Sequence, residues 1–357
     1  MTSTAVRPGG PVLVTGATGF TGACLVRSLV QDAIPVRILA RSAKRAGAMF
    51  PHGVDIVEGD ITDRTLVDEC TYGCNTVFHL AAAFREAGLK DERYHQVHVE
   101  GTRHVLDAAR KHGIGRVVHC STIGVLSHIE HPPADETLPY APGDIYQSTK
   151  AEGEQLALSY FRDFGIPVTV ARPTSIYGPG DMRLLKLFRM VAKERFIMIG
   201  RGEVFLHLVH VEDLVRGLRI LAAHPAALGE IFTIGGEEYR TLNDIVSVIA
   251  QETGVDRPRW RVPARPIQLL GSLCERICIP LGITPPIYRR RVDFFTKSRA
   301  FNIDKAKTRL GYQPLIDLRS GIRETIEWYR KNGLLPETAG PTMATSMSGA
   351  SPSSSQN

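Results

Sequence analysis

Short apolar runs alternate with longer segments in which apolar residues recur every three or four positions through the first half of the chain. The short runs are typical of buried strands and the longer segments of amphipathic helices. The predicted strands lie near Val12–Val14, Val36–Leu39, Val54–Val57, Thr76–Leu80, Arg116–His119 and Val168–Ala171, and the predicted helices near Thr21–Val30, Thr65–Cys70, Tyr94–Lys111 and Ser148–Phe161. This alternation predicts an α/β fold with a doubly wound parallel sheet, whose ligand lies at the carboxyl ends of the strands.

A glycine-rich octet, Thr15-Gly16-Ala17-Thr18-Gly19-Phe20-Thr21-Gly22, joins the first predicted strand to the first predicted helix. A buried strand that turns sharply into a helix leaves backbone N–H groups and the positive end of the helix dipole facing one point, where a pyrophosphate fits. Gly16 is expected to allow the tight turn, Gly19 to let the backbone approach the phosphate, and Gly22 to let the helix pack closely on the strand. The octet therefore predicts a dinucleotide-binding site.

Beyond Pro173 the predicted elements become shorter and less regular. They are helices near Leu184–Ala192, Leu214–Ala223, Leu242–Thr253 and Ser320–Lys331, and strands near Leu206–Val209 and Ile231–Ile234. We therefore predict a dinucleotide-binding Rossmann domain over residues 11–180, to which a segment of about 204–235 returns, and a smaller C-terminal α/β substrate-binding lobe over 181–335. Residues 1–10 and the Ser- and Gly-rich residues 336–357 are predicted to be disordered, because they hold too few large apolar groups to fold.

The composition is that of an ordinary globular protein, since 43% of the 357 residues are hydrophobic, enough for a full core. The six cysteines are scattered and form no CxxC pair, so we expect reduced thiols, no disulfide framework and no metal site. No apolar run reaches the roughly 20 residues that span a bilayer, and residues 1–10 have no hydrophobic signal core. We therefore expect a cytoplasmic protein.

The net charge of +6 is concentrated in one region, because Val255 to Arg309 holds 13 Lys and Arg against four Asp and Glu. One interpretation of this region is a solvated face, and the alternative is a surface for an anionic substrate or an acidic membrane. Nucleic acid is not expected as a partner, because no aromatic interleaving and no recognised reading motif accompany the charge.

Tyr146 and Lys150 stand four residues apart in Tyr146-Gln147-Ser148-Thr149-Lys150, which places a phenol and an ammonium on one face of a predicted helix. A free phenol has a pKa of about 10. Acid/base work near neutral pH therefore needs the phenolate to be favoured, which a Lys cation can do in a low-dielectric cleft. The spacing suits a proton-transfer pair. By itself it is more often an accident of a helix surface, and the preceding Ser121-Thr122 segment favours the proton-transfer interpretation.

The segment His119-Cys120-Ser121-Thr122 ends a predicted strand with two adjacent hydroxyls at the carboxyl edge of the sheet, where a hydroxyl can bind a substrate oxygen. At this point the chain, from Val12 to about Asn332, resembles the extended short-chain dehydrogenase/reductase family. The ordered motifs that carry the resemblance are the glycine octet, Gly59-Asp60-Ile61, His79-Leu80-Ala81-Ala82, Val99-Glu100-Gly101-Thr102, Ser121-Thr122, Tyr146 with Lys150, Arg172-Pro173-Thr174-Ser175-Ile176-Tyr177-Gly178-Pro179-Gly180, and His210-Val211-Glu212-Asp213-Leu214.

The resemblance implies roles for these residues. Tyr146 is the expected acid/base, Lys150 lowers its pKa and anchors the ribose, and the hydroxyl of Thr122 polarises the substrate carbonyl with Ser121 beside it. Asp60 is expected at the adenine with Ile61 alongside. The full set expected to bind the cofactor is Gly16, Thr18, Gly19, Phe20, Gly22, Arg41, Asp60, Ile61, Ala81, Ala82, Tyr146, Lys150 and Pro173.

One position departs from the family pattern. Members usually have Asn before the Val-x-Gly-Thr segment, and this chain has His98. Either His98 is a structural substitution that keeps a hydrogen bond, or it takes part in catalysis.

The choice of nicotinamide cofactor rests on the end of the second predicted strand. Relatives that prefer NAD have an acidic residue there for the ribose hydroxyls, whereas this chain has Ala40 followed by Arg41. An arginine can pair bidentately with a 2′-phosphate, so we predict NADP(H) in preference to NAD(H). The plain alternative is that Arg41 is a solvated surface charge.

Two positions separate the substrate classes of the family. Nucleotide-sugar enzymes that resemble this chain usually carry Asn and Arg, both for the substrate diphosphate, where this chain has Ser175 and Leu206. Arg172-Pro173-Thr174, the apolar stretch Pro263–Ile283 and Phe294-Phe295 also resemble the branch of 3β-hydroxysteroid dehydrogenases and dihydroflavonol reductases, whose substrates are hydrophobic, and we favour that branch. Arg289-Arg290-Arg291 keeps the alternative of a nucleotide-sugar 4-epimerase or dehydratase open, with Ser175 and Arg291 as candidate substrate residues. A second alternative is a non-catalytic NADP(H)-sensing protein, although sensors commonly lose the residues that stand here as Tyr146, Lys150 and Thr122.

The stretch Pro263–Ile283 is unusually apolar, with Leu269, Leu270, Leu273 and Ile277 at helical spacing. Such a helix either packs as core or, beside the basic cluster that extends to residue 291, contacts an anionic membrane surface. The resemblance further implies a small-molecule substrate and a homodimer that forms through helices such as Tyr94–Lys111 and Ser148–Phe161.

Overall fold

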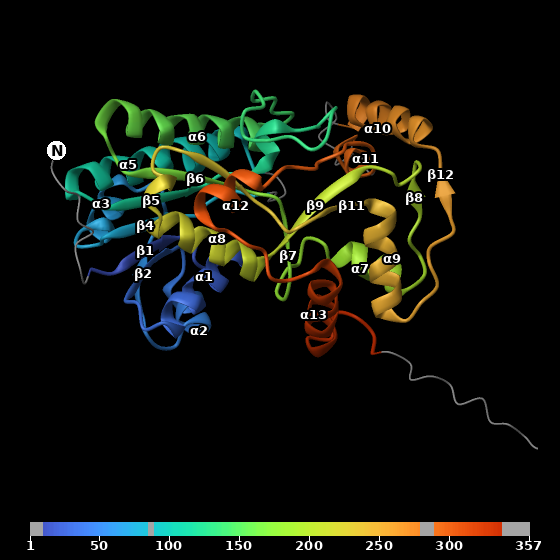
Figure 1. Cartoon of the computed structure of the whole chain (residues 1–357), viewed down its shortest axis with the longest axis horizontal. Coiled ribbons are helices and arrows are strands. Elements are labelled where there is room, and N and C mark those ends of the chain that lie inside the picture. Colours follow the sequence, from blue (N-terminus) through green and yellow to red (C-terminus); the bar gives the residue numbers. More distant parts are fainter. Residues whose placement is uncertain (1–9, 85–88, 279–288, 338–357) are drawn as a thin grey trace, which may run out of the picture.

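A seven-stranded parallel sheet organises the N-terminal two thirds of the molecule, as predicted (Figure 1). The structure is a computed structural model that describes residues 10–84, 89–278 and 289–337. The ends predicted to be disordered lie outside these residues, apart from Gly10, Pro336 and Glu337. The strand order is β10-β6-β5-β4-β1-β2-β3, and the strands are β1 (Val12–Thr15), β2 (Val36–Ala40), β3 (Val54–Glu58), β4 (Thr76–His79), β5 (Arg116–Cys120), β6 (Val168–Pro173) and β10 (Ile231–Ile234).

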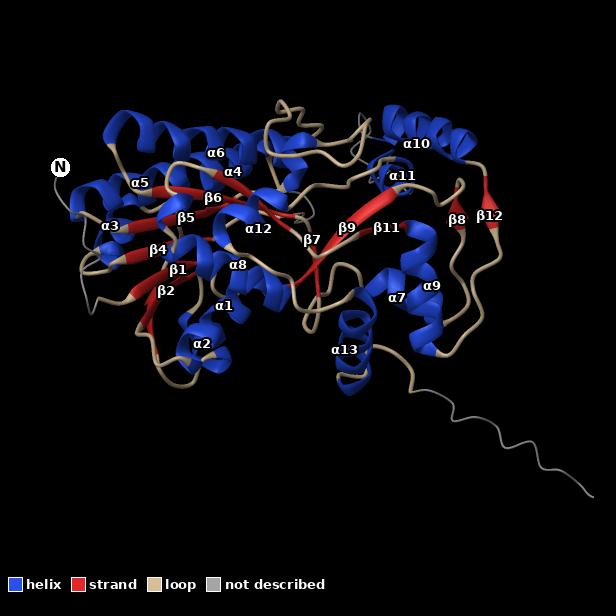
Figure 2. Ribbon diagram, viewed as in Figure 1, coloured by secondary structure: helices blue, strands red, loops and turns tan. Residues whose placement is uncertain are grey.

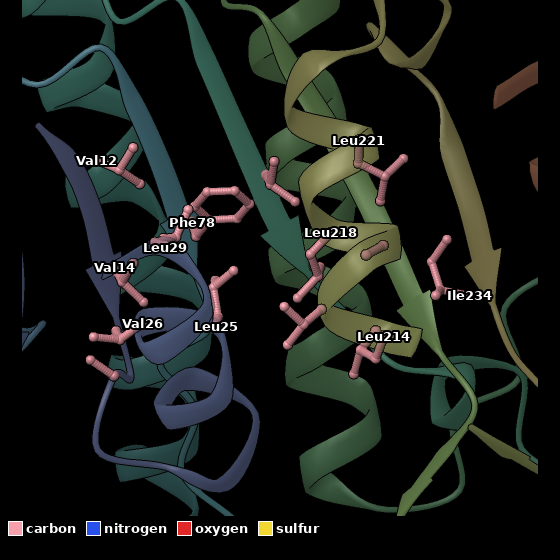
Figure 3. Close-up of a cluster of buried hydrophobic side chains, with 14 of the residues drawn as sticks. Val12, Val14, Leu25, Val26, Leu29, Phe78, Leu214, Leu218, Leu221 and Ile234 are labelled. Atoms are coloured by element: carbon pink, nitrogen blue, oxygen red, sulfur yellow. The ribbon is translucent and has the colours of Figure 1, made fainter. Parts of the chain in front are cut away.

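Helices cover both faces of this sheet (Figures 1 and 2). One layer consists of α1 (Phe20–Gln31), α2 (Ala43–Met49) and α8 (Val211–Ala223), and the other of α3 (Arg64–Thr71), α5 (Gly101–His112) and α6 (Ile145–Phe164). Figure 3 shows the core of the first layer, where Leu25 of α1 and Leu218 of α8 point toward the sheet. Both side chains are fully buried, and burial of each contributes roughly 1.5–3 kcal/mol to folding.

The remaining elements form a second, smaller assembly with its own apolar core. A three-stranded sheet has the order β11 (Tyr239–Thr241), β9 (Phe205–His210), β7 (Ser175–Tyr177), and β12 (Arg261–Val262) pairs with β8 (Met198–Ile199). The helices around them are α7 (Leu185–Ala192), α9 (Leu242–Thr253), α10 (Ala264–Cys278), α11 (Arg289–Thr296) and α13 (Leu318–Lys331). Helix α12 (Asp304–Leu310) instead packs on β10 of the main sheet.

Two predicted helices differ from the observed ones near the carboxyl edge of the sheet. The predicted helix 94–111 is divided into α4 (Asp91–His95), a π-helical turn η1 (Gln96–Glu100) and α5. Helix α6 starts at Ile145, three residues earlier than predicted, because the Asp144 carboxylate accepts a hydrogen bond from the Gln147 N–H at 2.9 Å. Tyr146 therefore lies in the first turn of α6.

The apolar helix predicted within 263–283 is α10, and its described side chains do not form core. Leu269 is 73% exposed and Leu270 is 51% exposed, whereas Ile267 and Gln268 are half-buried. The core interpretation is therefore wrong for the two leucines. Leu273 and Ile277 belong to the same predicted stripe, but their side chains are not among those described. Among the described helices, none is long and apolar enough to cross a bilayer.

Candidate active site

Three neighbouring strands bring the predicted site residues to one edge of the sheet. β1 ends at Thr15, β4 at His79 and β5 at Cys120, and Thr15 is paired in register with His79, which is paired with His119. The loops that follow these strands carry the glycine octet, Ala81–Ala83 and Ser121–Thr122. Because the strands are parallel, their carboxyl ends converge on the same edge.

The glycine octet forms a closely packed turn between β1 and α1. Gly16 has φ +71°, and a Cβ atom there would lie 2.7 Å from the backbone N of Ala81. A Cβ atom on Gly22 would lie within 2.2 Å of the Gly16 carbonyl oxygen, so only glycine lets α1 pack this closely on the turn. The octet thus builds the tight strand-to-helix turn that the sequence predicts.

The N-terminus of α1 has the electrostatic character of an anion site. Gly19 is the N-cap residue, no side chain caps the helix, and its first turn contains no acidic residue. The N–H groups of that turn and the positive end of the helix dipole therefore lack a side-chain counter-charge within α1. The turn fits the pyrophosphate of a dinucleotide, whose oxygens would accept hydrogen bonds there.

Arg183, which is not among the residues predicted from the sequence, lies with its guanidinium beside this turn. Its guanidinium lies 5.3 Å from the ring centroid of Phe20, and its Nε donates to Asp181 Oδ1 at 2.8 Å. Gly180, which has φ +98°, approaches the same ring. The Gly178-Pro179-Gly180 motif, which the sequence offers only as part of the family resemblance, could have pointed to Arg183. The chain at this motif passes close to Phe20 of α1 and brings Arg183 over it.

Lys150 is anchored at the centre of the site. Its side chain is almost fully buried, and Nζ donates a hydrogen bond to the Cys120 carbonyl oxygen at 2.6 Å. Burial lowers the pKa of Lys150, and the neighbouring Cys120 and Glu154 oppose that shift. The ammonium is thus held at the end of β5, one helical turn from Tyr146.

The ring of Tyr146 is half-buried between two other rings. The Phe84 ring meets it edge-on at a centroid distance of 5.2 Å, and the His98 ring meets it edge-on at 5.4 Å. Such T-shaped contacts restrict the orientation of an aromatic ring. The structure therefore places Tyr146 and Lys150 on one face of α6 and fixes both, as the four-residue spacing predicts.

The two adjacent hydroxyls of Ser121 and Thr122 point to different partners. Ser121 Oγ donates to the buried Glu154 carboxylate at 2.5 Å. Thr122 Oγ1 accepts the Gly124 N–H at 3.0 Å and keeps its own proton for donation. A Cβ atom on Gly124 would lie 3.4 Å from Gln147 Cγ, which shows how closely this turn packs on the start of α6. Thr122, rather than Ser121, is thus the hydroxyl suited to a substrate oxygen.

A fully buried ion pair between α6 and β6, which no motif of the sequence indicated, lies beside the site. Arg172 and Glu154 have 1% and 0% of their side chains exposed, and Arg172 Nη2 donates to Glu154 Oε1 at 2.6 Å. Tyr140 Oη also donates to Glu154 Oε1, at 2.9 Å. The sequence does contain a hint of this pair, because Glu154 follows Lys150 by four residues and so shares its helical face. The pair ties α6 to β6.

Asp60 is already held by neighbouring groups. Its Oδ1 accepts hydrogen bonds from the N–H and hydroxyl of Thr62, and its Oδ2 pairs with Arg93 Nη2 at 2.6 Å. Burial alone would raise the pKa of Asp60, but the bonds from Thr62 and Arg93 outweigh it and lower the pKa. An ionised carboxylate has a free lone pair left for an adenine amino group.

The other predicted cofactor residues are distributed around the same edge. Ile61 is buried and closely approaches Gly101, Arg41 is exposed directly after β2, and Pro173 ends β6. Ala81 is half-buried and Ala82 exposed, and the Ala81 N–H donates to Thr15 Oγ1 at 3.2 Å. Thr18 is half-buried within the octet.

Of the two predicted substrate residues, Ser175 lies on β7 and lines an apolar cavity of about 40 Å³. The backbone of Arg291 lies in α11, but its side chain is not among those described. The other residues that line the cavity are Tyr177, Leu184, Leu187, Phe188, Leu206, Leu208, Ile245, Ile249, Phe294 and Ile322. None of these lining residues carries a charge.

A dinucleotide-binding sheet, a strand-to-helix anion site and an adjacent Tyr–Lys pair define an enzyme of the nicotinamide-dependent oxidoreductase class. Residues 12–235 match the model of the NAD dependent epimerase/dehydratase family, and the chain belongs to that family.

The named relatives include both a hydroxysteroid enzyme and a sugar-nucleotide enzyme. The chain is 32% identical to a 3beta-hydroxysteroid-dehydrogenase/decarboxylase of Arabidopsis thaliana, over 88% of this chain and 78% of the relative. It is 31% identical to a dTDP-glucose 4,6-dehydratase of Streptomyces antibioticus, over 90% of this chain and 92% of the relative. The solved dTDP-glucose 4,6-dehydratase of Streptomyces venezuelae, which has NAD bound, superposes with a TM-score of 0.73 at 25% identity, over 91% of this chain and 98% of that one.

Proposed function

We propose that the protein reversibly oxidises a secondary alcohol, or reduces the corresponding ketone, on a hydrophobic substrate of steroid or flavonoid type. The carrying observation is that Ser175 and Leu206, where sugar-nucleotide enzymes usually keep diphosphate-binding residues, line one uncharged apolar cavity. Leu206 is only 4% exposed there. Burying a diphosphate against such a wall would leave its charge unpaired, at a large cost in free energy.

The cavity indicates the chemical character of this wall rather than the whole substrate site. Its volume of about 40 Å³ is far below the roughly 300–1,000 Å³ of ligand sites. The wall is built mainly from aliphatic and aromatic side chains of β7, β9, α7 and α9. A hydrophobic ring system gains free energy by leaving water against these groups.

The residues of the site divide the proposed chemistry among them. A bound nicotinamide supplies the hydride-accepting or hydride-donating carbon. The Tyr146 phenol exchanges the proton with the substrate oxygen, and the Thr122 hydroxyl donates a hydrogen bond to that oxygen. Lys150, held by the Cys120 carbonyl, provides the positive charge that favours the phenolate.

We propose NADP(H) as the preferred cofactor. β2 ends at Ala40, so no carboxylate stands there to bind the ribose hydroxyls or to repel a 2′-phosphate. The exposed Arg41 that follows can pair with such a phosphate.

A nucleotide-sugar epimerase or dehydratase is the second candidate, and one observation favours it. Helix α11 begins with Arg289, Arg290 and Arg291, and Phe294 of the same helix lines the apolar cavity. Three consecutive cations this close in sequence to a lining residue are the groups that would hold a diphosphate in place of the missing Asn and Arg.

One paired assay separates the two candidates. Hydroxysteroid-like ketones and alcohols are screened for a change in NADPH or NADP⁺ absorbance, and UDP- and dTDP-sugars are screened for epimerised or dehydrated products. Consumption of NADPH with a ketone supports the dehydrogenase. Because an epimerase returns its hydride, product formation on a sugar nucleotide without net absorbance change would replace the first proposal with the second.

We also propose that α10 contacts an anionic membrane surface, from which a hydrophobic substrate could enter. Its leucines Leu269 and Leu270 are exposed, and so is Trp260 (74%), which precedes α10 in the chain. The exposed cations of the same segment are Arg257, Arg259 and Arg261 before α10 and Arg265 and Arg276 within it. Apolar groups bordered by arginines match the interior and the headgroups of an anionic lipid surface.

A homodimer through α5 and α6 is the proposed quaternary state. These helices pack side by side at one edge of the molecule (Figure 1). Sedimentation equilibrium would test it, and a monomer at micromolar concentration would contradict it.

A further inference from the structure

His98 lies at the junction of the elements that build the candidate site. It belongs to the π-helical turn η1, and only 1% of its surface is exposed. A Cβ atom on Gly153 of α6 would lie 2.4 Å from the His98 carbonyl oxygen, so the backbone of this turn packs directly on α6. π-Helical turns inside helices are frequent at functional sites.

The hydrogen bonds of the His98 ring fix its tautomer. The Ala83 N–H points to Nε2 at 3.0 Å, and Nδ1 lies 2.8 Å from Thr149 Oγ1. An amide can only donate, so Nε2 accepts and the proton of the neutral ring resides on Nδ1. Thr149 then accepts from Nδ1 and donates to the Ile145 carbonyl oxygen at 2.8 Å. The ring thereby links the loop after β4 to the first turn of α6.

A second chain of hydrogen bonds ends at the backbone of the same residue. The Ala81 N–H donates to Thr15 Oγ1, which donates to His79 Nδ1 at 2.8 Å. His79 Nε2 lies 3.0 Å from Thr102 Oγ1, whose proton goes to the His98 carbonyl oxygen at 2.6 Å. Both chains run from the Ala81–Ala83 loop, and both pass through or end at His98.

The same imidazole also contacts the proposed acid/base. Its ring meets the ring of Tyr146 at a centroid distance of 5.4 Å and an interplanar angle of 82°. Tyr94 lies on another side, at 5.9 Å. A single side chain thus contacts the cofactor-lining loop, the first turn of α6 and the Tyr146 ring.

We propose that His98 is a positioning residue that couples the Ala81–Ala83 loop to Tyr146, so that binding of the dinucleotide and placement of the phenol depend on one neutral imidazole. The inference rests on the proposed acid/base role of Tyr146. Asn, the usual residue at this position of the family, is too short to reach both hydrogen-bond partners and offers no ring to Tyr146.

The surroundings keep this imidazole neutral across the physiological range. Burial, and then the positive charge of Lys150, lower the pKa of His98 to about 2. The titratable groups that face it are Lys150, His79, Tyr94 and Tyr146. A neutral ring can keep Nε2 as an acceptor for the Ala83 amide.

Two substitutions separate the contacts. His98→Gln keeps an acceptor that can reach the Ala83 N–H but loses the ring, so we expect the dissociation constant for NADPH to stay within about twofold and kcat to fall at least tenfold. His98→Phe keeps the ring and leaves the Ala83 N–H without its acceptor, so we expect the NADPH dissociation constant to rise at least tenfold, with a smaller loss of kcat. His95→Gln, at an exposed position in α4, is the matched control and changes neither.

A purely structural role would lower the thermal midpoint without this split between binding and turnover. Folded variants whose kcat and NADPH affinity both stay within twofold of wild type would overturn the proposal. NMR of ¹⁵N-histidine-labelled wild type decides the case even if a variant does not fold. We expect a proton on Nδ1 and none on Nε2 of His98, and the opposite tautomer would also overturn it.

NADPH titration by fluorescence and the NMR spectrum need no substrate. If no ketone or alcohol is turned over by the wild type, the proposed function fails while the coupling remains testable by these two measurements.

Discussion

Lys150 Nζ and the Cys120 carbonyl oxygen are joined by a hydrogen bond of 2.6 Å, which connects helix α6 to the end of strand β5. The bond places the ammonium directly before Ser121 and Thr122 and one turn after Tyr146. The bond also gives the carbonyl oxygen at the end of this strand a donor. The position of the cation is therefore set by the sheet, and the position of the phenol follows from the helix.

Tyr146→Phe removes the proposed proton donor and leaves the ring contacts in place. We expect turnover to fall at least 100-fold, since general acid/base catalysis contributes roughly 10²–10⁴-fold, while NADPH affinity changes little. Steady-state kinetics and fluorescence titration measure the two effects. Tyr72→Phe, at a 70% exposed position, is the control. Normal turnover by the Tyr146 variant would show that another group is the acid/base.

Arg41→Ala is expected to weaken NADPH binding at least tenfold and NADH binding little, because a charge-assisted bond to the 2′-phosphate is lost. Titration of both cofactors into wild type and variant measures this. Arg45→Ala, on the exposed side of α2, should leave both affinities unchanged. A wild type that binds NADH at least tenfold more tightly than NADPH would refute the preference.

Arg172→Met breaks the buried pair with Glu154 and leaves a carboxylate without its cation. Removal of one member of such a pair costs about 3–5 kcal/mol of unfolding free energy, which urea denaturation followed by circular dichroism would detect. Arg162→Met, in an exposed pair with Asp163, should leave the denaturation midpoint unchanged. An Arg172→Met variant with the denaturation midpoint of the wild type would contradict the prediction.

Acidification should destabilise the protein through its buried histidines. Burial lowers the pKa of His79 to about 3 and that of His98 to about 2, so both rings stay neutral in the fold at pH 5. In the unfolded chain they gain a proton below a pKa of about 6.5. The unfolded state then binds more protons, and the stability present above that pH is lost as the pH falls.

The expected loss between pH 7 and pH 5 is about 2 kcal/mol for each of these two rings, measured by urea denaturation at both values. His98→Asn should reduce the loss of unfolding free energy by about 2 kcal/mol, the share of one ring. Substitution of the exposed His52 should leave the loss unchanged. An equal stability at pH 7 and pH 5 would contradict the prediction.

Flotation with liposomes tests the proposed membrane surface. We expect the protein to float with vesicles that contain phosphatidylserine at low salt, more weakly at high salt, and poorly with phosphatidylcholine alone. The double variant Leu269→Glu/Leu270→Glu should lose binding to the vesicles. Leu315→Glu is the control and should retain it, because Leu315 is 69% exposed but lies outside α10 and outside the basic segment 255–309. The proposal would be refuted if the protein floated at neither salt concentration, or if α10 were found to mediate self-association instead.

The sequence carried enough information for the sheet, because the inner strands of a parallel sheet are covered on both faces and are therefore mainly apolar runs, as in β1 and β4. The sharp strand-to-helix turn could also be predicted from the glycine octet. Its glycines are required by the local backbone, since a Cβ atom on Gly16 or Gly22 would overlap neighbouring backbone atoms. Helical spacing placed Tyr146 and Lys150 on one face, whereas their expected roles came from the resemblance to a known family. The short strands β8 and β12 were not predicted, because two residues carry no periodicity.

Tertiary structure decided which neighbours each polar side chain meets. Ser121 and Thr122 are adjacent in sequence, yet one donates to Glu154 and the other accepts from Gly124. The π-helical turn at His98 also lies within a continuous helical pattern, and only its packing on α6 reveals it. Likewise, the apolar period of α10 indicates an amphipathic helix but not that Leu269 and Leu270 face outward. Local periodicity follows from the bonds along the chain, whereas these partners come from segments tens of residues apart that only the folded packing brings together.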